Sequence, residues 1–199
     1  KSFLNPSDTL NIKFEAPFFV IQGEFVREDG TEETIYCGVK KGVKKVFRKN
    51  GKDYDRLSDH IGLIPLVVVN PSDGVLIMGG SEERRRFMDS VISQYDRHYL
   101  DHLISYNRVL SQRNALLKQL SKGNGEMATM EVLDLQLAQH GIIIHEKRKE
   151  FIGKIKPLFH NFYANLAGET EDVTIEYDSV QQSKSFAQAL DESRRKDHA

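Results

Sequence analysis

Three consecutive arginines follow a pair of glycines in the stretch GGSEERRRFMDSVISQY, residues 79–95. Arg84, Arg85 and Arg86 fall near the start of a predicted helix, where the positive end of the helix macrodipole disfavours cations. A guanidinium group binds carboxylates and phosphates through a planar fork of N–H donors. Their electrostatically unfavourable place raises the question of what they bind; on the helix, Arg86 is predicted to point into solvent.

One face of this predicted helix is apolar. It carries Phe87, Met88, Val91, Ile92 and Tyr95. At roughly 100° per residue, Arg84 falls within this face, so we expect it to be partly buried and to need a polar partner. In a structural interpretation, Arg84 binds a loop carbonyl or Asp73, and Arg85 pairs with Asp89. In a functional interpretation, the arginines and the glycine pair hold a phosphate. Both interpretations stay open at this point.

A second concentration of charge is the basic segment, residues 40–52, with the sequence KKGVKKVFRKNGK. Its seven cations, with no acid among them, are Lys40, Lys41, Lys44, Lys45, Arg48, Lys49 and Lys52. On a hairpin they could neutralise several phosphates and give salt-dependent affinity for DNA. Lysines also protect an exposed edge strand against pairing with other chains. The sequence leaves both functions open.

Other residues that could do chemistry lack suitable neighbours in the sequence. His98 and His102 have a spacing compatible with metal binding, but no third ligand has a defined place, so we expect no metal site. Cys37 alternates into a predicted strand and is expected to be a buried, small apolar residue. The sequence contains no Ser-His-Asp group and no pair of carboxylates whose spacing would place them together, so we expect no intrinsic active site.

The order of elements predicts an α+β fold. Residues 18–69 are typical of antiparallel strands with turns at Asp29-Gly30 and Asn50-Gly51, and LVVV at 66–69 resembles a buried strand. Helices are predicted at 81–95, 96–121, 127–167 and 183–197, and a short strand at 173–177. Ser81 is the expected N-cap of the first helix. Pro157 should kink or divide the third helix.

The second and third helices carry matching apolar stripes. Leu100, Leu103, Ile104, Leu110 and Leu117 are predicted to face Ile144, Phe151, Ile155, Leu158 and Phe162 in an antiparallel pair. Asn107 and Asn114 fall on the first stripe, where they would fix the register. Arg148 interrupts the second and is expected to pair with an acid on the facing helix. Arg113 is a candidate contact for a partner subunit or for DNA.

Length and composition are compatible with one domain, or with one small domain plus an extended element. The chain has 199 residues and a net charge of −1, so only local patches can argue for nucleic acid. A single cysteine, no signal peptide and no apolar run near about 18 residues predict a cytoplasmic setting and no membrane partner. The chain starts at Lys1 and stops within a helical pattern, so we expect an internal piece of a longer protein.

Two segments carry a resemblance to a known family. PSDGVLIMGGSEERRRFMD, residues 71–89, resembles the signature segment of the RecF family, bacterial repair ATPases of the ABC/SMC-like class. The matching residues are Pro71, Leu76, Ile77, Gly79, Gly80, Arg84, Arg85, Phe87, Met88 and Asp89. YNRVLSQRNALLK, residues 106–118, is similar to a second family helix. Ser72 replaces a family acid, which shifts to Asp73, and Ser81 replaces a proline.

The resemblance implies that residues 1–80 are the β-rich arm of ATPase lobe I and that residues 81–199 are the helical lobe II, with its coiled-coil-like arm. Such proteins dimerise around ATP, with Mg²⁺, bind duplex or gapped DNA, and act with RecO and RecR in recombinational repair, replication and the SOS response. The family's phosphate-binding loop would precede Lys1, and its signature and Walker B segments would follow Ala199. We therefore expect no cofactor and no ATP hydrolysis in this chain alone, and a weak DNA-dependent ATPase in the intact protein.

Two groups of site residues follow. The DNA-binding candidates are Lys40, Lys41, Lys44, Lys45, Arg48, Lys49 and Arg113. The candidates for the junction between the lobes are Pro71, Gly79, Gly80, Arg84, Arg85 and Asp89. The alternative function is a helical adaptor that docks another protein and has no nucleic-acid role.

Overall fold

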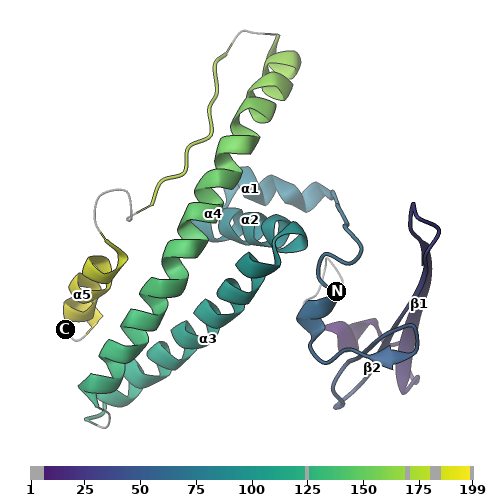
Figure 1. Cartoon of the computed structure of the whole chain (residues 1–199), viewed down its shortest axis with the longest axis horizontal. Helices are drawn as coiled ribbons and strands as arrows, with labels where there is room; N and C mark the ends of the chain where they lie inside the picture. The colour runs from purple at the N-terminus through teal and green to yellow at the C-terminus, as the bar shows by residue number, and fades with distance from the viewer. Residues whose placement is uncertain (1–6, 124–125, 169–170, 180–184, 198–199) are drawn as a thin grey trace. The chain divides into compact units, whose positions relative to one another are not determined.

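The computed structural model describes residues 7–123, 126–168, 171–179 and 185–197. The fold is α+β, as predicted: a small antiparallel sheet precedes a set of helices. The chain divides into two compact units, residues 1–65 and 66–199 (Figure 1). The assignment of residues 1–80 and 81–199 to two ATPase lobes stays a prediction.

The first unit is built on a four-stranded antiparallel meander. Its strands are β1 (Phe18–Val26), β2 (Glu32–Lys40), β3 (Val46–Lys49) and β4 (Lys52–Asp53), in the spatial order β1-β2-β3-β4. The predicted Asn50-Gly51 turn joins β3 to β4, and both residues have left-handed φ values of 50° and 79°. Asn and Gly are the residues that tolerate this conformation, so the turn follows from the sequence.

Burial alternates along β2, which makes it the centre of the first unit. Ile35, Cys37 and Val39 are buried on one face, as the strand period of two requires. Two 3₁₀-helices complete this unit: η1 (Asp8–Asn11), which contacts β2, and η2 (Leu57–His60). Cys37 is buried, as predicted, and its burial raises the pKa of the thiol.

The second unit is helical. Its elements are η3 (Pro71–Gly74), α1 (Val75–Met78), α2 (Ser81–Tyr95), α3 (Arg97–Leu120), α4 (Met127–Ala167) and α5 (Phe186–Asp197). α3 and α4 form an antiparallel pair, α2 packs against both of them, and α5 packs on α4 (Figure 1). The predicted helix ranges are therefore close to those in the structure. α4 continues through Pro157 as a single helix.

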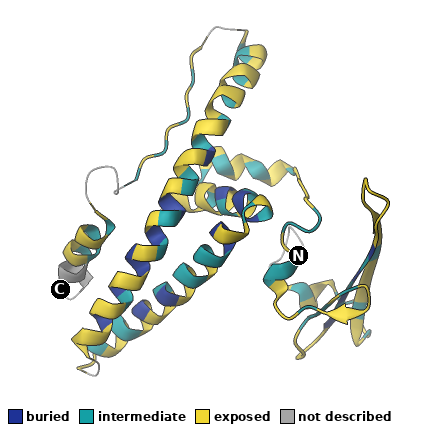
Figure 2. Cartoon of the chain, in the orientation of Figure 1, coloured by how far each residue is buried: buried dark blue, intermediate teal, exposed yellow. Residues whose placement is uncertain are grey.

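The core of the helical unit lies where α2, α3 and α4 meet. Met88, Ile92, Tyr99, Ile144 and Phe151 form one buried cluster, and Figure 2 shows buried residues concentrated along these three helices. Burial of these side chains is the main favourable contribution to folding here, at about 1.5–3 kcal/mol for each large apolar side chain.

The predicted seam ends before the last turns of α4. Ile144 and Phe151 are in the core, but Leu158 is 57% exposed and Phe162 is 69% exposed. Ile104 of α3 is also exposed, at 45%. The apolar spacing of the sequence continues beyond the part of α4 that α2 and α3 cover, so the pattern alone predicted too long an interface.

Two predicted strands are not strands. Residues 66–69 form no strand, and Val67 and Val69 are 87% and 84% exposed. Residues 173–177 are extended but pair with no strand in the described chain. Val173, Ile175 and Tyr177 are instead half-buried, in a segment that runs beside the distal part of α4 (Figure 1).

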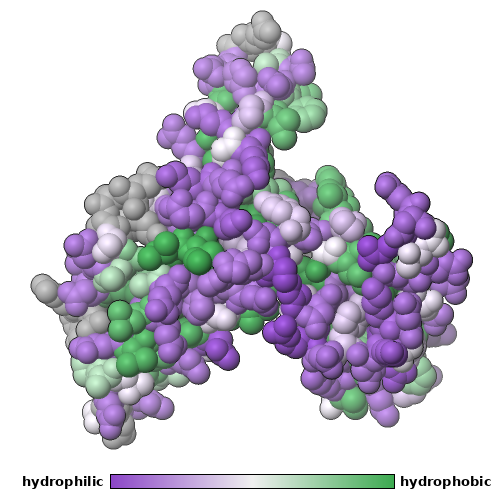
Figure 3. Space-filling view, in the orientation of Figure 1, coloured by the Kyte–Doolittle hydropathy of each residue, from purple (hydrophilic) through white to green (hydrophobic). Residues whose placement is uncertain are grey.

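Both units expose large apolar side chains, among them Phe18, Ile21 and Val26 of β1. On the face drawn in Figure 3, hydrophilic side chains cover most of the first unit, whereas hydrophobic side chains gather over the helices of the second. None of the helices in the described ranges combines the length and the apolar character needed to cross a bilayer.

Candidate nucleic-acid interface and helical junction

Three cations of the basic segment are ion-paired within the first unit. The pairs are Lys45 with Asp8 at 2.9 Å, Arg48 with Asp53 at 2.8 Å, and Lys49 with Glu33 at 2.9 Å. Glu33 is buried and also binds Arg27 at 2.9 Å. Hydrogen bonds from Lys49 and Arg27 lower the pKa of Glu33. These cations stabilise the sheet, and their charges are partly neutralised.

The remaining lysines of the basic segment project into solvent. Lys40 ends β2, and Lys41 and Lys44 lie in the connection to β3, all three exposed. Within the part of the chain that the structure describes, no carboxylate lies within ion-pair distance of Lys40, Lys41, Lys44 or Lys52. Unpaired ammonium groups close together on one loop are suited to contact phosphates of a nucleic-acid backbone.

The aromatic side chains near the basic segment are occupied within the first unit. Lys45 lies over the ring of Phe47 at 5.1 Å, and Arg48 lies over the ring of Tyr36 at 5.4 Å. Tyr54 packs edge-on against His60, with ring centroids 5.6 Å apart. Base stacking on these rings is therefore not favoured, and the loop offers charge contacts rather than a stacking platform.

Arg113 does not belong with the exposed cations. It is buried, at 5% exposure, and its Nε donates to Oδ1 of Asp134 at 2.7 Å, which ties α3 to α4. The expectation that Arg113 contacts DNA or a partner is corrected here, because a buried guanidinium with a carboxylate partner cannot reach a phosphate outside the fold. Its role is to hold the far end of the α3–α4 pair.

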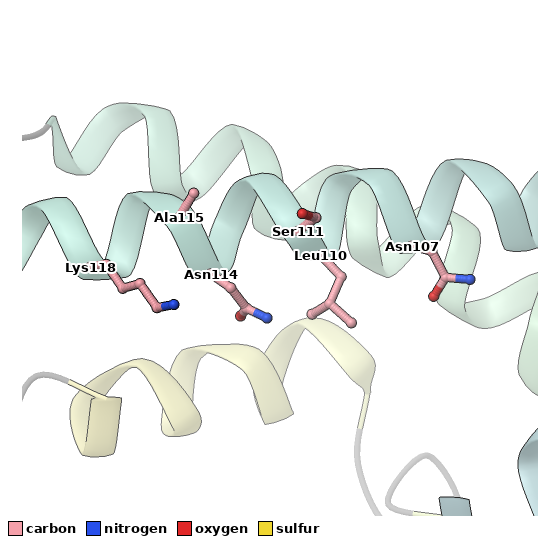
Figure 4. A pocket seen from close by; sticks show the side chains of 6 residues that line it. All are labelled: Asn107, Leu110, Ser111, Asn114, Ala115 and Lys118. Atoms are coloured by element: carbon pink, nitrogen blue, oxygen red, sulfur yellow. The ribbon is translucent and has the colours of Figure 1, made fainter. Parts of the chain in front are cut away.

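Asn107 and Asn114 also lie elsewhere than predicted. Both are exposed, on the side of α3 that faces α5, and do not occupy the seam with α4 (Figure 4). With their neighbours they line a hollow of about 420 Å³. The lining residues are Asn107, Leu110, Ser111, Asn114, Ala115 and Lys118. The register of α3 on α4 is therefore set by other contacts, the Arg113–Asp134 pair among them.

The predicted junction begins with a capped turn. Pro71 is the first residue of η3, and Asn70 precedes it as N-cap, its side chain accepting from the N–H of Ser72 at 2.8 Å. Asp73 in turn accepts from the N–H of Asn70 at 2.8 Å. This reciprocal cap satisfies backbone donors at the start of the turn. Asp73 therefore supplies a polar contact in this loop although Ser72 replaces the family acid.

The two glycines of the motif have different requirements. Gly79 donates to the carbonyl of Val75 at 2.7 Å, and a Cβ at position 79 would lie 2.4 Å from that oxygen, so a side chain cannot fit. A Cβ at Gly80 would lie 3.6 Å from the Glu83 carboxylate, an ordinary contact. Gly80 is the N-cap of α2 and Ser81 is its first residue, which corrects the predicted cap position.

Arg84 holds the glycine turn through two carbonyls. Its Nη1 donates to the oxygens of Leu76 at 3.1 Å and of Gly79 at 3.0 Å. The carbonyl partner agrees with the structural interpretation, but Arg84 is exposed and the predicted partial burial is wrong. The reason is that the buried side of α2 includes Met88, whereas Phe87 is 44% exposed. The buried face of α2 was therefore predicted too close to Phe87 and Arg84.

Arg85 and Arg86 are satisfied along their own helix. Arg85 donates to the Ser81 hydroxyl at 2.8 Å and not to Asp89, which corrects the predicted pair. Arg86 pairs with Glu82 at the surface, one turn earlier. Both contacts are exposed and contribute little to stability. Asp89 is therefore available to a partner on another helix.

Asp89 binds two residues from the other helices of the core. Nε and Nη2 of Arg148 donate to Oδ1 and Oδ2 of Asp89, each at 2.8 Å. The Tyr99 hydroxyl donates to Oδ1 of Asp89 at 2.5 Å. We call Asp89, Tyr99 and Arg148 the junction triad, since they come from α2, α3 and α4 respectively. Arg148 has the acidic partner that its position suggested, but on α2 and not on α3.

The junction triad is largely shielded from solvent. The Asp89 and Arg148 side chains are 19% and 14% exposed, and Tyr99 is fully buried. Burial alone would lower the pKa of Arg148, but the charge of Asp89 raises it overall. Burial, followed by the hydrogen bond to Asp89, raises the pKa of Tyr99. Arg148 therefore stays charged and Tyr99 neutral, and the triad serves as a fixed tie between three helices.

A second link between α3 and α4 lies beside the triad. Asp96, the N-cap of α3, accepts from the N–H of Tyr99 at 2.9 Å and binds Lys147 of α4 at 2.7 Å. Lys147 and Arg148 thus have structural partners, and His145 is buried, so residues 145–150 are not simply a solvated face. Burial alone would raise the pKa of Asp96, but the hydrogen bonds from Lys147 and from the Tyr99 N–H lower it overall.

The structure also brings together three histidines that the sequence keeps apart. His98 and His102 lie one turn apart on α3, and His140 of α4 is beside His102. Sequence spacing identified the first two, but the third comes from another helix, 38 positions further on. Among the described residues, no group of three or more His, Cys, Asp or Glu side chains is arranged to hold a metal ion.

These observations define an α+β protein in which a β unit that carries the basic segment precedes a helical unit tied together at a three-helix junction. Several curated proteins named DNA replication and repair protein RecF are similar to the chain. The protein of Phocaeicola vulgatus is 49% identical over 197 residues, which are 99% of this chain and 53% of the relative. That of Bacteroides thetaiotaomicron is 50% identical with the same coverage, and that of Flavobacterium johnsoniae is 46% identical over 200 residues, 55% of its length.

Solved structures give the same result. One, described as the recombination mediator protein RecF-ATP in the RecFOR pathway, superposes with a TM-score of 0.87 at 25% identity, over 100% of this chain and 55% of that one. A second solved structure, described as RecF-ATPrS in the same pathway, superposes with a TM-score of 0.78 at 28% identity. The match covers 84% of this chain and 45% of that one. No family model matches the sequence. The chain is similar to RecF proteins over its whole length, and it spans about half the length of the curated relatives it matches.

Proposed function

We propose that this chain is the DNA- and partner-contacting part of a RecF-like ATPase of recombinational DNA repair. The observation that carries the proposal is the similarity over the chain's whole length to proteins named for DNA replication and repair. The similar solved structures are described as RecF with ATP in the RecFOR pathway. For the intact protein, the proposal includes binding of ATP with Mg²⁺, a weak DNA-dependent ATPase activity and ATP-dependent dimerisation. It also includes RecO and RecR as partners in loading recombinase at gaps.

Within this proposal, the lysines without carboxylate partners form the DNA contact. Lys40, Lys41 and Lys44 are exposed and close together in the chain, whereas Lys45, Arg48 and Lys49 are paired with acids of the sheet unit. Ammonium groups on an exposed loop are suited to contact phosphates, and phosphate contacts carry no sequence information. We therefore expect binding to duplex DNA without sequence preference.

A helical protein adaptor is the second candidate, and a specific feature of α4 favours it. Leu158, Phe162 and Leu166 recur every four residues, on one face of the distal helix, and are 57%, 69% and 88% exposed. Apolar side chains grouped on a surface commonly mark a protein contact. This surface is compatible with partner binding in either function, so it does not by itself require an adaptor.

The salt dependence of DNA binding distinguishes the two functions. We expect the chain to bind a labelled duplex, with an affinity that falls at least about tenfold between about 50 and 200 mM salt, because several condensed counterions are released. The control is a duplex of the same length and scrambled sequence, which should bind equally. Binding that is absent at low salt, or present but insensitive to salt, would favour the adaptor.

A further inference from the structure

A row of imidazoles crosses the contact between α3 and α4. Nε2 of His98 lies 3.1 Å from Nε2 of His102, and Nδ1 of His102 lies 2.9 Å from Nδ1 of His140. The rings meet edge to face, with centroids 4.4 Å and 5.1 Å apart. His102 uses both of its ring nitrogens, one toward each neighbour, so it is the centre of the row.

The hydrogen bonds of this row depend on the number of bound protons. A neutral imidazole has one N–H donor and one acceptor nitrogen, whereas a charged imidazolium has two donors and no acceptor. Three neutral rings can therefore form both bonds. A single proton on His102 also leaves both bonds possible, because the two outer rings can accept. A second proton places two cations, or two facing donors, within hydrogen-bond distance.

The surrounding charges do not compensate for such a pair of cations. The ionisable groups that act on His102 are His98 and Asp101 of α3 and His140 of α4. Asp101 is shared with Arg97, whose Nε lies 3.6 Å from its carboxylate. Burial, together with the charges that His98 and His140 would carry, lowers the pKa of His102, and only Asp101 opposes this.

The other polar ties between α3 and α4 do not respond in the same range of pH. Arg113 with Asp134, and Asp96 with Lys147, are carboxylate pairs with strongly basic partners. Their ordinary pKa values lie far from neutrality, whereas that of histidine lies near 6.5. The imidazole row is therefore the contact of this helix pair that mild acid would change.

We propose that His98, His102 and His140 form a pH-sensitive clasp that holds α3 on α4 while the rings are neutral and loosens when two of them are protonated. The clasp lies next to the junction triad, since His98 is adjacent to Tyr99 in the chain. The direction of the pH effect follows from proton linkage. A histidine whose pKa is lower in the folded chain than in the unfolded chain stabilises the fold at pH values above its unfolded pKa of about 6.5. That stability is lost as the pH falls through the folded pKa.

Imidazole titration by nuclear magnetic resonance tests the clasp in the unmodified chain, with EDTA present to remove metal ions. We expect the ¹⁵N shifts to show the rings hydrogen-bonded to one another at about pH 7.5, and the pKa of His102 to lie below its ordinary value of about 6.5. Three independent titrations, each near the value of an exposed histidine, would overturn the proposal. This measurement needs no variant.

A variant pair tests the effect on stability. His102→Gln removes the central ring, and His160→Gln removes an exposed histidine elsewhere on α4, 58% exposed in its side chain. Between about pH 7.5 and 5.5, the unfolding constant of the wild-type chain in urea should rise at least about threefold more than that of His102→Gln, because the variant loses the coupled titration. His160→Gln should follow the wild type. If the unfolding constants of the wild type and of His102→Gln depended on pH to the same extent, the proposed clasp would be wrong.

Discussion

Arg84 and Asp89 lie on the same helix and hold different parts of the helical unit. Arg84 binds the carbonyls of Leu76 and Gly79 and so fixes the turn that enters α2. Asp89 binds Arg148 and so fixes α4 against the other side of the same helix. The arginine-rich motif therefore connects the segment before α2 with the long helix behind it, and its charges are used for geometry within the fold.

The first prediction concerns Asp89, whose loss leaves a shielded cation without its partner. Asp89→Asn keeps the shape of the side chain but removes the charge that faces Arg148. We expect the free energy of unfolding to fall by about 2–4 kcal/mol, less than for a fully buried pair because the triad is not completely shielded. Urea unfolding of the chain at neutral pH measures the change.

The matched control is a surface ion pair of the same helix. Arg86→Ala removes the partner of Glu82, where both side chains are more than half exposed. This variant should change the free energy of unfolding by less than about 0.5 kcal/mol. If Asp89→Asn were as mild as Arg86→Ala, the triad would not be a tie between helices.

Residue types were easier to predict than their partners. The sequence indicated that Arg84 needs a carbonyl or an acid and that Arg148 needs an acid, because each cation falls on a predicted apolar face; the face predicted for Arg84 was wrong, but its carbonyl partner was right. It could not indicate that Asp89 is the acid for Arg148, since the two are 59 positions apart and meet only once α2 packs on α4. The predicted Arg85–Asp89 pair failed for the same reason.

At the scale of elements, α5 is held by a close approach of a ring to a helix. A Cβ at Gly141 of α4 would lie 3.1 Å from the ring of Phe186, and Phe186 also contacts Tyr106 of α3, with ring centroids 6.3 Å apart. α5 thus packs where α4 has no side chain. Glycine is otherwise unfavourable inside a helix, so its position here has a packing reason.

Two glycine replacements in α4 test this contact. Gly153→Ala meets nothing within 4 Å and should stabilise the chain by about 0.5–1 kcal/mol through helix propensity alone. Gly141→Ala gains the same propensity but crowds Phe186, so it should be less stable than Gly153→Ala by about 1 kcal/mol or more. Amide exchange of α5 should rise only in Gly141→Ala. The same stability and α5 exchange in both variants would contradict the close approach.

The helices were predictable as elements because their apolar spacing recurs over many turns. The same spacing could not show where a partner helix stops, so Leu158 and Phe162 were assigned to a seam that does not reach them. Short apolar runs carried less information. Residues 66–69 and 173–177 have the composition of strands, but no strand of the described chain pairs with either. A strand needs a neighbour, which composition cannot supply.

At the scale of the whole molecule, a net charge of −1 conceals an uneven distribution of charge. The basic segment contains no acid, yet the fold neutralises Lys45, Arg48 and Lys49 through acids from elsewhere in the sheet unit. Sequence counting therefore overestimated the charge available to DNA. The relatives are nearly twice as long as this chain, so in those proteins the segment similar to it is one part of a larger molecule.

The salt dependence of DNA binding after removal of three of the four unpaired lysines of the basic segment tests the central claim most directly. Replacing Lys40, Lys41 and Lys44 by alanine should weaken binding and reduce the slope of log affinity against log salt by about 2–3, since each lost phosphate contact contributes about 0.9. A control with the same change in net charge, in which Lys122, Lys149 and Lys154 of the helical unit are replaced, should keep the wild-type slope. An unchanged slope in the first variant, or an equal loss in both, would contradict the assignment of the basic segment to DNA.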